Sequence, residues 1–354
     1  MSDRPHKAVT VGSATIDIIA FIANADIEQM RLTNQTASFL LMEPGRKVDA
    51  ENIKTYFGGG GVNAAISLKR QGFETAALVK LGTCVNGQSI EAELARQGID
   101  GYLVRHDPAH ATAVSLLIAS HDRDAAIFTH RGANEYLNAE DIAGDPFKGA
   151  DLVYIAGLSN ASADLFPEIV RQARAAGAFV ATNPGIRQLT SKTRAFFDSL
   201  SNVDLFICNR VEARALIPKL VERTGWDAER ALELSPGEPV LEIEGFRLPY
   251  ADYFRRMHSL GPRFVGITDG SDGAYVSDAG EIHFQAVVPA NVQGTTGAGD
   301  SFASTLAGAL GRGETVANAL LLAAYNAASV VSHPDAHAGL LTSPELIRAA
   351  DNHR

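Results

Sequence analysis

The chain has 354 residues, of which 46% are hydrophobic, so it can bury the core of one large α/β domain or of two smaller ones. Its formal net charge is -10 and it contains no basic run, which argues against a nucleic acid or a membrane surface as a partner. The longest apolar runs are too short to cross a membrane, and the first residues lack the apolar region of a signal peptide. Its two cysteines, Cys84 and Cys208, lie far apart, and we expect buried, unpaired thiols in a cytoplasmic protein.

The N-terminal segment places a single carboxylate behind a predicted strand. Residues 8–11 are an apolar run that ends in Gly12, which predicts a buried strand. Asp17 is the lone charge in the apolar stretch 13–22, and residues 24–57 read as an excursion of short strands. Because ligands of open parallel sheets bind beyond the carboxyl ends of the strands, Asp17 is either a ligand for substrate hydroxyls or a capping residue.

Four consecutive glycines, 58–61, precede a predicted helix. Apolar spacing over 62–69 indicates the helix, and Gly72 is its natural end. Asn63 lies in its first turn, where its amide can both donate and accept hydrogen bonds. The glycines form either a flexible hinge or, as we favour, a turn that lets the backbone approach a ligand closely.

The middle of the chain alternates between strands and helices. The apolar runs 112–119 and 125–129 indicate a hairpin. Beyond them the candidate strands are 152–155, 179–182, 205–208 and 264–268. Alternation of this kind predicts a mostly parallel sheet covered by helices. Residues 219–262 interrupt the rhythm, and we interpret them as an insertion that contains a short strand pair at 240–248.

The stretch VQGTTGAGDSF at 292–302 is the most informative part of the sequence. Phe302, Leu306 and Leu310 repeat every four residues, as on the buried stripe of a helix, so the turn lies at a helix N-terminus. Converging N–H groups and the helix dipole make such a turn attractive to an anion. Asp300 would repel phosphate, but it is well placed to deprotonate a hydroxyl that attacks phosphorus. The alternative is a glycine turn that only starts a helix.

The order of these elements resembles the ribokinase/PfkB family of carbohydrate kinases. The resemblance rests on the strand-end aspartate, on GGGGVN at 58–63, on NRVE at 209–212, on TDGSDG at 268–273 and on GTTGAGDSF at 294–302. It covers nearly the whole chain and implies a single α/β domain over 1–354. This domain would be a doubly wound three-layer α/β/α core with a small β-sheet lid, formed by roughly 14–57 and 99–130, over the sugar site.

The resemblance also implies roles for individual residues. Asp300 would be the general base that takes the proton from the acceptor hydroxymethyl group, and the amides of Gly297, Ala298 and Gly299 would hold the transferring phosphoryl group. The sugar-binding positions would be Asp17, Gly59, Gly60, Asn63 and Asn134. The nucleotide-binding positions would be Asn209, Thr268, Gly270, Gly273 and Asn326. Glu212 would organise Mg²⁺, through water, around the phosphates of ATP.

The implied activity is ATP-dependent phosphorylation of a free sugar, with a nucleoside as the alternative acceptor and a non-catalytic binding protein as a rival class. A sugar phosphate ranks lower, because Arg46-Lys47 is the one basic pair expected near the lid. Gly294 stands where many members carry an aspartate that helps to hold a monovalent cation, so a potassium requirement is in doubt. Lid sheets of the family often pair, which leaves a homodimer through the lid open. We expect His333 and His337 to be surface residues.

Overall fold

The computed structural model describes residues 6–22, 28–31, 38–41, 45, 47–119, 125–190, 193–225, 238–243 and 246–352. Arg46, Trp226 in the predicted insertion and the turn of the predicted hairpin at 121–124 lie outside the described residues. Among the helices that the structure describes, none combines the length and the apolar character that a bilayer crossing requires.

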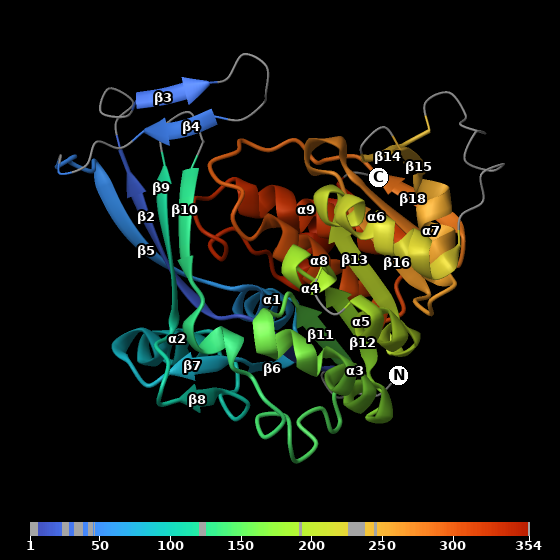
Figure 1. Ribbon diagram of the computed structural model, residues 1–354, viewed down its shortest axis with the longest axis horizontal. Coiled ribbons are helices and arrows are strands. Elements are labelled where there is room, and N and C mark those ends of the chain that lie inside the picture. Colours follow the sequence, from blue (N-terminus) through green and yellow to red (C-terminus); the bar gives the residue numbers. More distant parts are fainter. Residues whose placement is uncertain are drawn as a thin grey trace.

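The described residues form a main sheet of eight strands in the order β18-β17-β16-β13-β12-β11-β1-β6 (Figure 1). These strands are β1 Lys7–Val11, β6 Glu74–Leu78, β11 Leu152–Ala156, β12 Phe179–Asn183, β13 Leu205–Asn209, β16 Phe264–Thr268, β17 Ala274–Asp278 and β18 Glu281–Gln285. The strands from β6 to β16 are parallel, and β17 and β18 extend the sheet as antiparallel strands. Strands buried on both faces require continuous apolar runs, and for this reason the sequence pattern located them.

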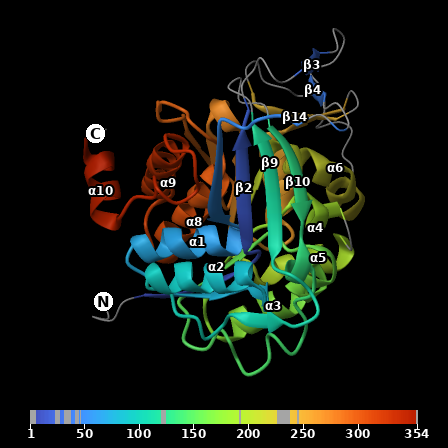
Figure 2. The ribbon, with the colours of Figure 1, turned by 90° about the vertical axis from the view of Figure 1, so that its left-hand side faces the viewer.

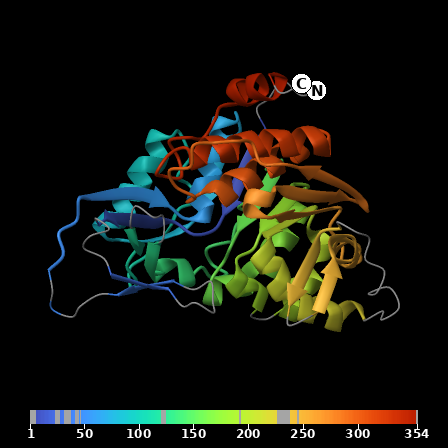
Figure 3. The ribbon, with the colours of Figure 1, turned by 90° about the horizontal axis from the view of Figure 1, so that it is seen from above.

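Helices cover both faces of this sheet, which confirms the predicted three-layer core. One face packs against α3, α5, α6 and α7, and the other against α1, α8 and α9, so that Figure 3 shows the two groups on opposite sides of the strands. These helices are α1 Gly60–Arg70, α3 Phe166–Ala175, α5 Thr193–Ser199, α6 Arg210–Thr224, α7 Tyr250–His258, α8 Ala298–Gly311 and α9 Val316–Val331. Shorter or peripheral helices are α2 Val85–Arg96, α4 Ile186–Thr190 and α10 Ser343–Asp351.

A second, four-stranded sheet stands away from the core, in the order β10-β9-β2-β5. Its strands are β2 Thr15–Phe21, β5 Asn52–Gly58, β9 Ala113–Ala119 and β10 Ala125–His130. Figure 2 shows this sheet face-on. Three of its strands fall within the ranges predicted for the lid, and β5 extends one residue beyond them. Residues 99–112, which the prediction included, pack largely with the core, because Ile99, Leu103 and Val104 are buried there and β8 Arg105–Asp107 pairs with β7 Lys80–Gly82. Asp17 therefore lies inside a lid strand and not at the end of a core strand.

Two short two-stranded sheets, β3-β4 and β14-β15, lie outside the two larger sheets. Strands β3 Glu28–Arg31 and β4 Ser38–Leu41 pair above the lid (Figure 1). Strands β14 Val240–Ile243 and β15 Phe246–Pro249 form the strand pair that the sequence predicted within 219–262. The following α7 buries Tyr250, Tyr253, Phe254 and Met257 in the main core, so this part of the insertion is integrated with the domain.

Candidate active site

Asp300 lies in the first turn of α8, where the sequence placed it. The N-cap residue Gly297 has φ 78°, in the left-handed region that L-residues with a Cβ rarely adopt. A Cβ at this position would also collide with Ala336. The sharp turn that these constraints produce lets the backbone enter the helix directly before Asp300, and the Ser301 amide donates to the Gly297 carbonyl oxygen at 2.8 Å.

The N-terminal end of α8 is exposed at Gly299 and partly exposed at Gly297 and Ala298. The first N–H groups of an α-helix have no intrahelical acceptor and carry the positive end of the dipole. The Ala298 amide makes a long bond of 3.3 Å to the Thr295 carbonyl oxygen. Gly299 is exposed, and no other described part of the chain comes within 4 Å of the place where its Cβ would stand. This end of α8 can therefore receive an anionic group.

Asn63 joins the start of α1 to Asp300. Its Nδ2 donates to Asp300 Oδ2 at 2.7 Å, and the Asn63 side chain is buried. Helix α1 begins after Gly59, whose φ of 93° and whose contact with the Ser13 carbonyl group leave no room for a Cβ. At Gly60 a Cβ would stand 3.3 Å from Asp300 Oδ1, so the glycine allows the carboxylate to lie against the helix. The predicted sugar-binding turn and the predicted base thus meet in one place.

The negative charges of Asp17 and Asp300 repel each other across the site. Burial raises the pKa of Asp300 above its ordinary 3.8, the Asn63 hydrogen bond opposes this shift, and the negative charge of Asp17 adds to it. Burial also raises the pKa of Asp17, against hydrogen bonds from the hydroxyls of Thr15, at 3.0 Å, and Ser115. A carboxylate with a raised pKa is a stronger base once it is ionised, which suits Asp300 for proton abstraction.

His337 is the site residue that the sequence interpretation missed. The prediction of a surface histidine was wrong, because the residue is only 8% exposed and its Nε2 lies 2.8 Å from Asn63 Oδ1. Burial lowers the pKa of His337 to about 4. No local sequence pattern predicts the contact between His337 and Asn63, because the two residues are separated by 274 positions. His333 is partly buried, with its Nδ1 at 3.0 Å from the Ser329 carbonyl oxygen.

Two asparagines assigned to ligands have structural partners. Asn134 donates from Nδ2 to the Ala14 carbonyl oxygen at 3.0 Å and accepts from the Ala14 amide at 3.1 Å, so it ties the lid to the core. Asn326, predicted to line the adenine pocket, is fully buried. Its Nδ2 donates to Thr305 Oγ1 at 2.8 Å, and its Oδ1 accepts from the Leu341 amide at 2.9 Å. A side chain so enclosed cannot contact adenine, so this assignment is corrected.

The predicted nucleotide-binding residues gather at the carboxyl ends of β13 and β16. Asn209 and Thr268 are register partners at these strand ends. Asn209 caps α6, with its Oδ1 accepting from the Glu212 amide at 2.9 Å. Gly270 is exposed in the turn that follows β16, whereas Gly273, with φ 103°, packs against Phe284 and Gln285 of β18. Asn209, Thr268 and Gly270 therefore lie at the carboxyl ends of the parallel strands, where open sheets bind their ligands.

Glu212 fits a magnesium ion held mainly through water. Burial raises its pKa, a hydrogen bond from the Asn209 amide lowers it, and the negative charge of Asp300 raises it further. The negative charges of Glu212 and Asp300 repel each other, and a divalent cation bound near them would reduce this repulsion. No group of three or more His, Cys, Asp or Glu in the described ranges forms a metal cage. Mg²⁺ commonly binds through one or two carboxylates, waters and substrate phosphates, and Glu212 can contribute in that way.

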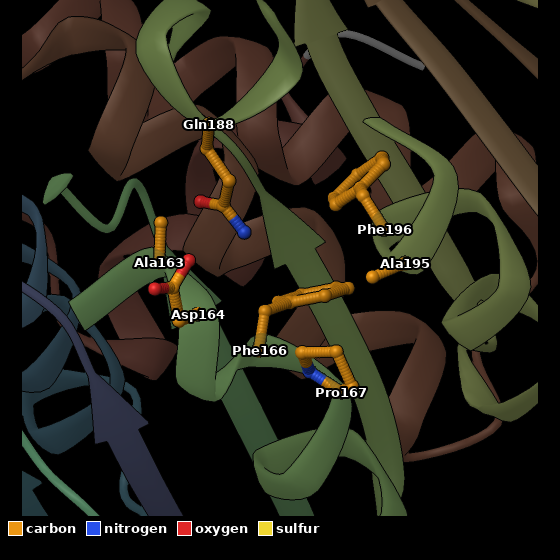
Figure 4. A pocket seen from close by; sticks show the side chains of 7 residues that line it. All are labelled: Ala163, Asp164, Phe166, Pro167, Gln188, Ala195 and Phe196. Carbon is orange, nitrogen blue, oxygen red and sulfur yellow. The ribbon is translucent and has the colours of Figure 1, made fainter. Parts of the chain in front are cut away.

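A separate cavity of about 120 Å³ lies on the α3 face of the sheet. It is lined by Ala163, Asp164, Phe166, Pro167, Gln188, Ala195 and Phe196. Figure 4 shows the Gln188 amide reaching into it. Gln188 Oε1 accepts from the Leu158 amide at 3.0 Å, and its buried Nε2 has no hydrogen-bond partner. The cavity lies across the sheet from α8 and does not belong to the site around Asp300.

The fold and the comparisons define a phosphotransferase whose acceptor is an alcohol group. A family model described as pfkB family carbohydrate kinase matches residues 6–238 and 250–343, and the chain belongs to this family.

Individual relatives agree with this assignment. The chain is 26% identical over 247 residues to an ATP-dependent ribose-1-phosphate kinase of Halopiger xanaduensis, covering 70% of this chain and 71% of the relative. It is 28% identical over 278 residues to the aminoimidazole riboside kinase of Salmonella typhimurium, covering 77% and 79%. The structure of Arabidopsis thaliana ribokinase complexed with ribose and ATP superposes with a TM-score of 0.73 at 22% identity, covering 98% of this chain and 99% of that one.

Proposed function

We propose that this chain transfers the γ-phosphoryl group of Mg-ATP to the hydroxymethyl group of a sugar. One observation carries the proposal: Asn63 holds Asp300 in the first turn of α8, beside the partly exposed N-terminal end of the helix and opposite Asp17. A sugar whose hydroxyls bind Asp17 would place its hydroxymethyl oxygen between the base and the phosphoryl group. Positioning of this kind supplies much of the rate enhancement in phosphoryl transfer.

The reaction balances with these groups. The acceptor oxygen forms a bond to the γ-phosphorus, the bond from that phosphorus to the bridging oxygen of ADP breaks, and the hydroxyl proton moves to Asp300. The amides at 297–299 stabilise the charge on the equatorial oxygens of the phosphoryl group. Asn209, Thr268 and Gly270 would bind the nucleotide, and Glu212 would hold Mg²⁺ through water, where the ion would neutralise phosphate charge.

The acceptor we favour contains a ribosyl group. Several relatives are named for ribose, deoxyribose, ribose 1-phosphate and aminoimidazole riboside, which share a pentose ring with a terminal hydroxymethyl group. One relative, 22% identical over 354 residues, is named as a 5-dehydro-2-deoxygluconokinase and acts outside this group. The ribosyl compounds differ in what is attached at C1. A free sugar and a nucleoside therefore remain the two leading acceptors, and both would use Asp17 and Asp300 in the same way.

A phosphorylated sugar is a further candidate because two arginines lie within electrostatic reach of each other beside the lid. Arg131 directly follows β10, and its Nη1 donates to Ser159 Oγ at 3.0 Å just beyond β11. Burial lowers the pKa of Arg131, the positive charge of Arg187, in α4, lowers it further, and the negative charge of Glu135 opposes both. Two like charges held together favour an anion between them. The sequence did not predict this pair, and Arg46 of the predicted pair Arg46-Lys47 lies outside the described residues.

The test is ADP release from Mg-ATP with ribose, 2-deoxyribose, a purine nucleoside and ribose 1-phosphate as acceptors. Turnover with any of them excludes a pure binding protein, and the preferred acceptor identifies the C1 substituent. If ribose 1-phosphate is preferred, Arg131→Gln should raise its KM and leave the KM of ribose unchanged. Absence of turnover with every member of the panel would count against the ribosyl acceptor, and binding of ATP without turnover would favour the non-catalytic class.

A further inference from the structure

We propose that His337 is a positioning residue for phosphoryl transfer: its imidazole fixes the orientation of the Asn63 amide, so that the amide N–H points at the Asp300 carboxylate. The inference rests on the proposed function, in which Asp300 is the base. It concerns a chain of three side chains from three separate parts of the sequence, the segment after α9, helix α1 and helix α8.

Only one orientation of the Asn63 amide satisfies both of its neighbours. An ionised carboxylate accepts hydrogen bonds and cannot donate, so Nδ2 must face Asp300, where it lies 2.7 Å from Oδ2. The amide oxygen then faces His337 Nε2 at 2.8 Å, and because this oxygen only accepts, Nε2 must carry the proton. Rotating the amide by 180° would set oxygen against carboxylate and N–H against N–H. The carboxylate thus sets the orientation of the amide, and the imidazole, with its proton on Nε2, reinforces the orientation that serves the base.

The segment that carries His337 is anchored on both sides. Asp335 Oδ1 accepts from the amides of His337 and Ala338, each at 2.8 Å, which closes a tight turn around the imidazole. On the other side, Arg70 Nη1 donates to the Leu340 carbonyl oxygen at 2.8 Å. Asn326 accepts from the next amide along the chain, as described above. The buried position of Asn326 thus has a purpose within the same arrangement, since it helps to fix the segment that holds the imidazole.

Burial keeps His337 neutral. Burial is the largest influence and lowers its pKa to about 4, while Asp335 and Glu93 raise it and Arg70 and Arg96 lower it. Neutral imidazole with its proton on Nε2 is a constant donor across the physiological pH range.

The influences on Asp300 are different. Asp17 faces it from β2 and raises its pKa, Asn63 lowers it from α1, and Glu212 in α6 and Tyr154 in β11 lie within electrostatic reach. Of these groups, the Asn63 amide is the one that His337 controls. Loss of the imidazole would free the amide to rotate, remove its support of the ionised carboxylate and raise the pKa of Asp300 further.

The test compares His337→Leu, which removes the donor, with His337→Gln, whose side-chain amide can still donate to Asn63. His337→Leu should lower kcat roughly tenfold, as expected for one lost hydrogen bond, and shift the acid limb of kcat/KM to higher pH. His337→Gln should restore most of both. His333→Leu, a histidine exchanged four positions earlier in the same segment, is the matched control and should leave the pH profile unchanged. If His337→Leu does not fold, His337→Met, which fills irregular space, takes its place.

A second readout separates this inference from the proposed function. The carboxyl ¹³C shift of Asp300, assigned with Asp300→Asn, reports its pKa without any turnover, and the pKa should be higher in His337→Leu than in the wild type. In the double variant with Asn63→Leu, the His337 substitution should have no further effect. An unchanged Asp300 pKa in His337→Leu, or equal impairment in His337→Gln, overturns the positioning role. Absence of wild-type turnover with every acceptor of the panel, together with a shifted pKa, would instead count only against the proposed reaction of Asp300 with a ribosyl acceptor.

Discussion

Replacing Asp300 by asparagine tests the general base directly. The substitution is isosteric, and Asn63 Nδ2, now 2.7 Å from Oδ2, can donate to the new amide oxygen as it does to the carboxylate. The new NH₂ group would then lie on the Oδ1 side, near Gly60, and it could only donate to an acceptor hydroxyl bound there. We therefore expect an intact fold and a site that cannot take up a proton.

The expected loss follows from the role of a positioned base. Such a group contributes roughly 10²–10⁴ in rate, which corresponds to about 3–5 kcal/mol of transition-state stabilisation. The assay is ADP release with the best acceptor of the panel, reported as kcat and KM, and nucleotide affinity is measured separately by calorimetry. The nucleotide should still bind, because Asn209 and Thr268, its predicted contacts, lie at the ends of β13 and β16 and not in the helix that carries Asp300.

The control is Asp100→Asn, which makes the same change of charge at an exposed position. It should leave kcat, KM and nucleotide affinity at their wild-type values. Near-normal turnover in Asp300→Asn would remove this residue from the role of base. Loss of nucleotide binding together with loss of turnover would show that the carboxylate supports the nucleotide site, and the lower rate would then not identify Asp300 as the base.

Three further predictions concern the rest of the site and the lid. The base must be ionised, so kcat/KM should fall as pH decreases through the pKa of Asp300, with a midpoint above the ordinary 3.8; a midpoint at or below that value contradicts the burial argument. Gly294 offers no carboxylate, and a Cβ there would stand 3.2 Å from the His333 carbonyl oxygen, so exchanging Na⁺ for K⁺ at fixed ionic strength should change the rate little, whereas strong activation would refute this. Ile53, Leu116 and Phe128 are exposed on the lid face opposite Asp17, so Phe128→Glu should weaken a lid-mediated dimer in sedimentation experiments; a monomeric wild type would rule that dimer out.

The layered core was predictable because its signals are local. The parallel strands are apolar runs buried on both faces, and each lies within a residue or two of its predicted bounds, as β11 Leu152–Ala156 and β16 Phe264–Thr268 illustrate. The helix that follows the GAGD turn was located by the four-residue spacing of Phe302, Leu306 and Leu310, all of which are buried. The lid hairpin was also located, since its two apolar runs pair as β9 and β10.

The partners of buried polar side chains were not predictable in the same way. Asn134, Asn326 and His337 belong to no periodic pattern, and their hydrogen bonds depend on how distant segments pack. An asparagine that binds a ligand and one that satisfies a buried amide look alike in sequence, because both need the same donor and acceptor. For Asn326 a family position suggested a ligand, and the enclosure of the side chain decided against it.

The contact between the glycine run at 58–61 and the GAGD turn at 297–300 accounts for the glycines. On its own, each was open to a purely structural interpretation, as a hinge or as an ordinary helix start. In the structure, a Cβ at residue 58 would overlap Asp17 Oδ2, and a Cβ at residue 60 would crowd Asp300 Oδ1. Glycine is therefore needed at 58 and 60 because a side chain there would displace the carboxylates of Asp17 and Asp300, independently of any ligand. Because a hinge would place no such demand on positions so far away in the sequence, the close fit argues that both motifs build one site.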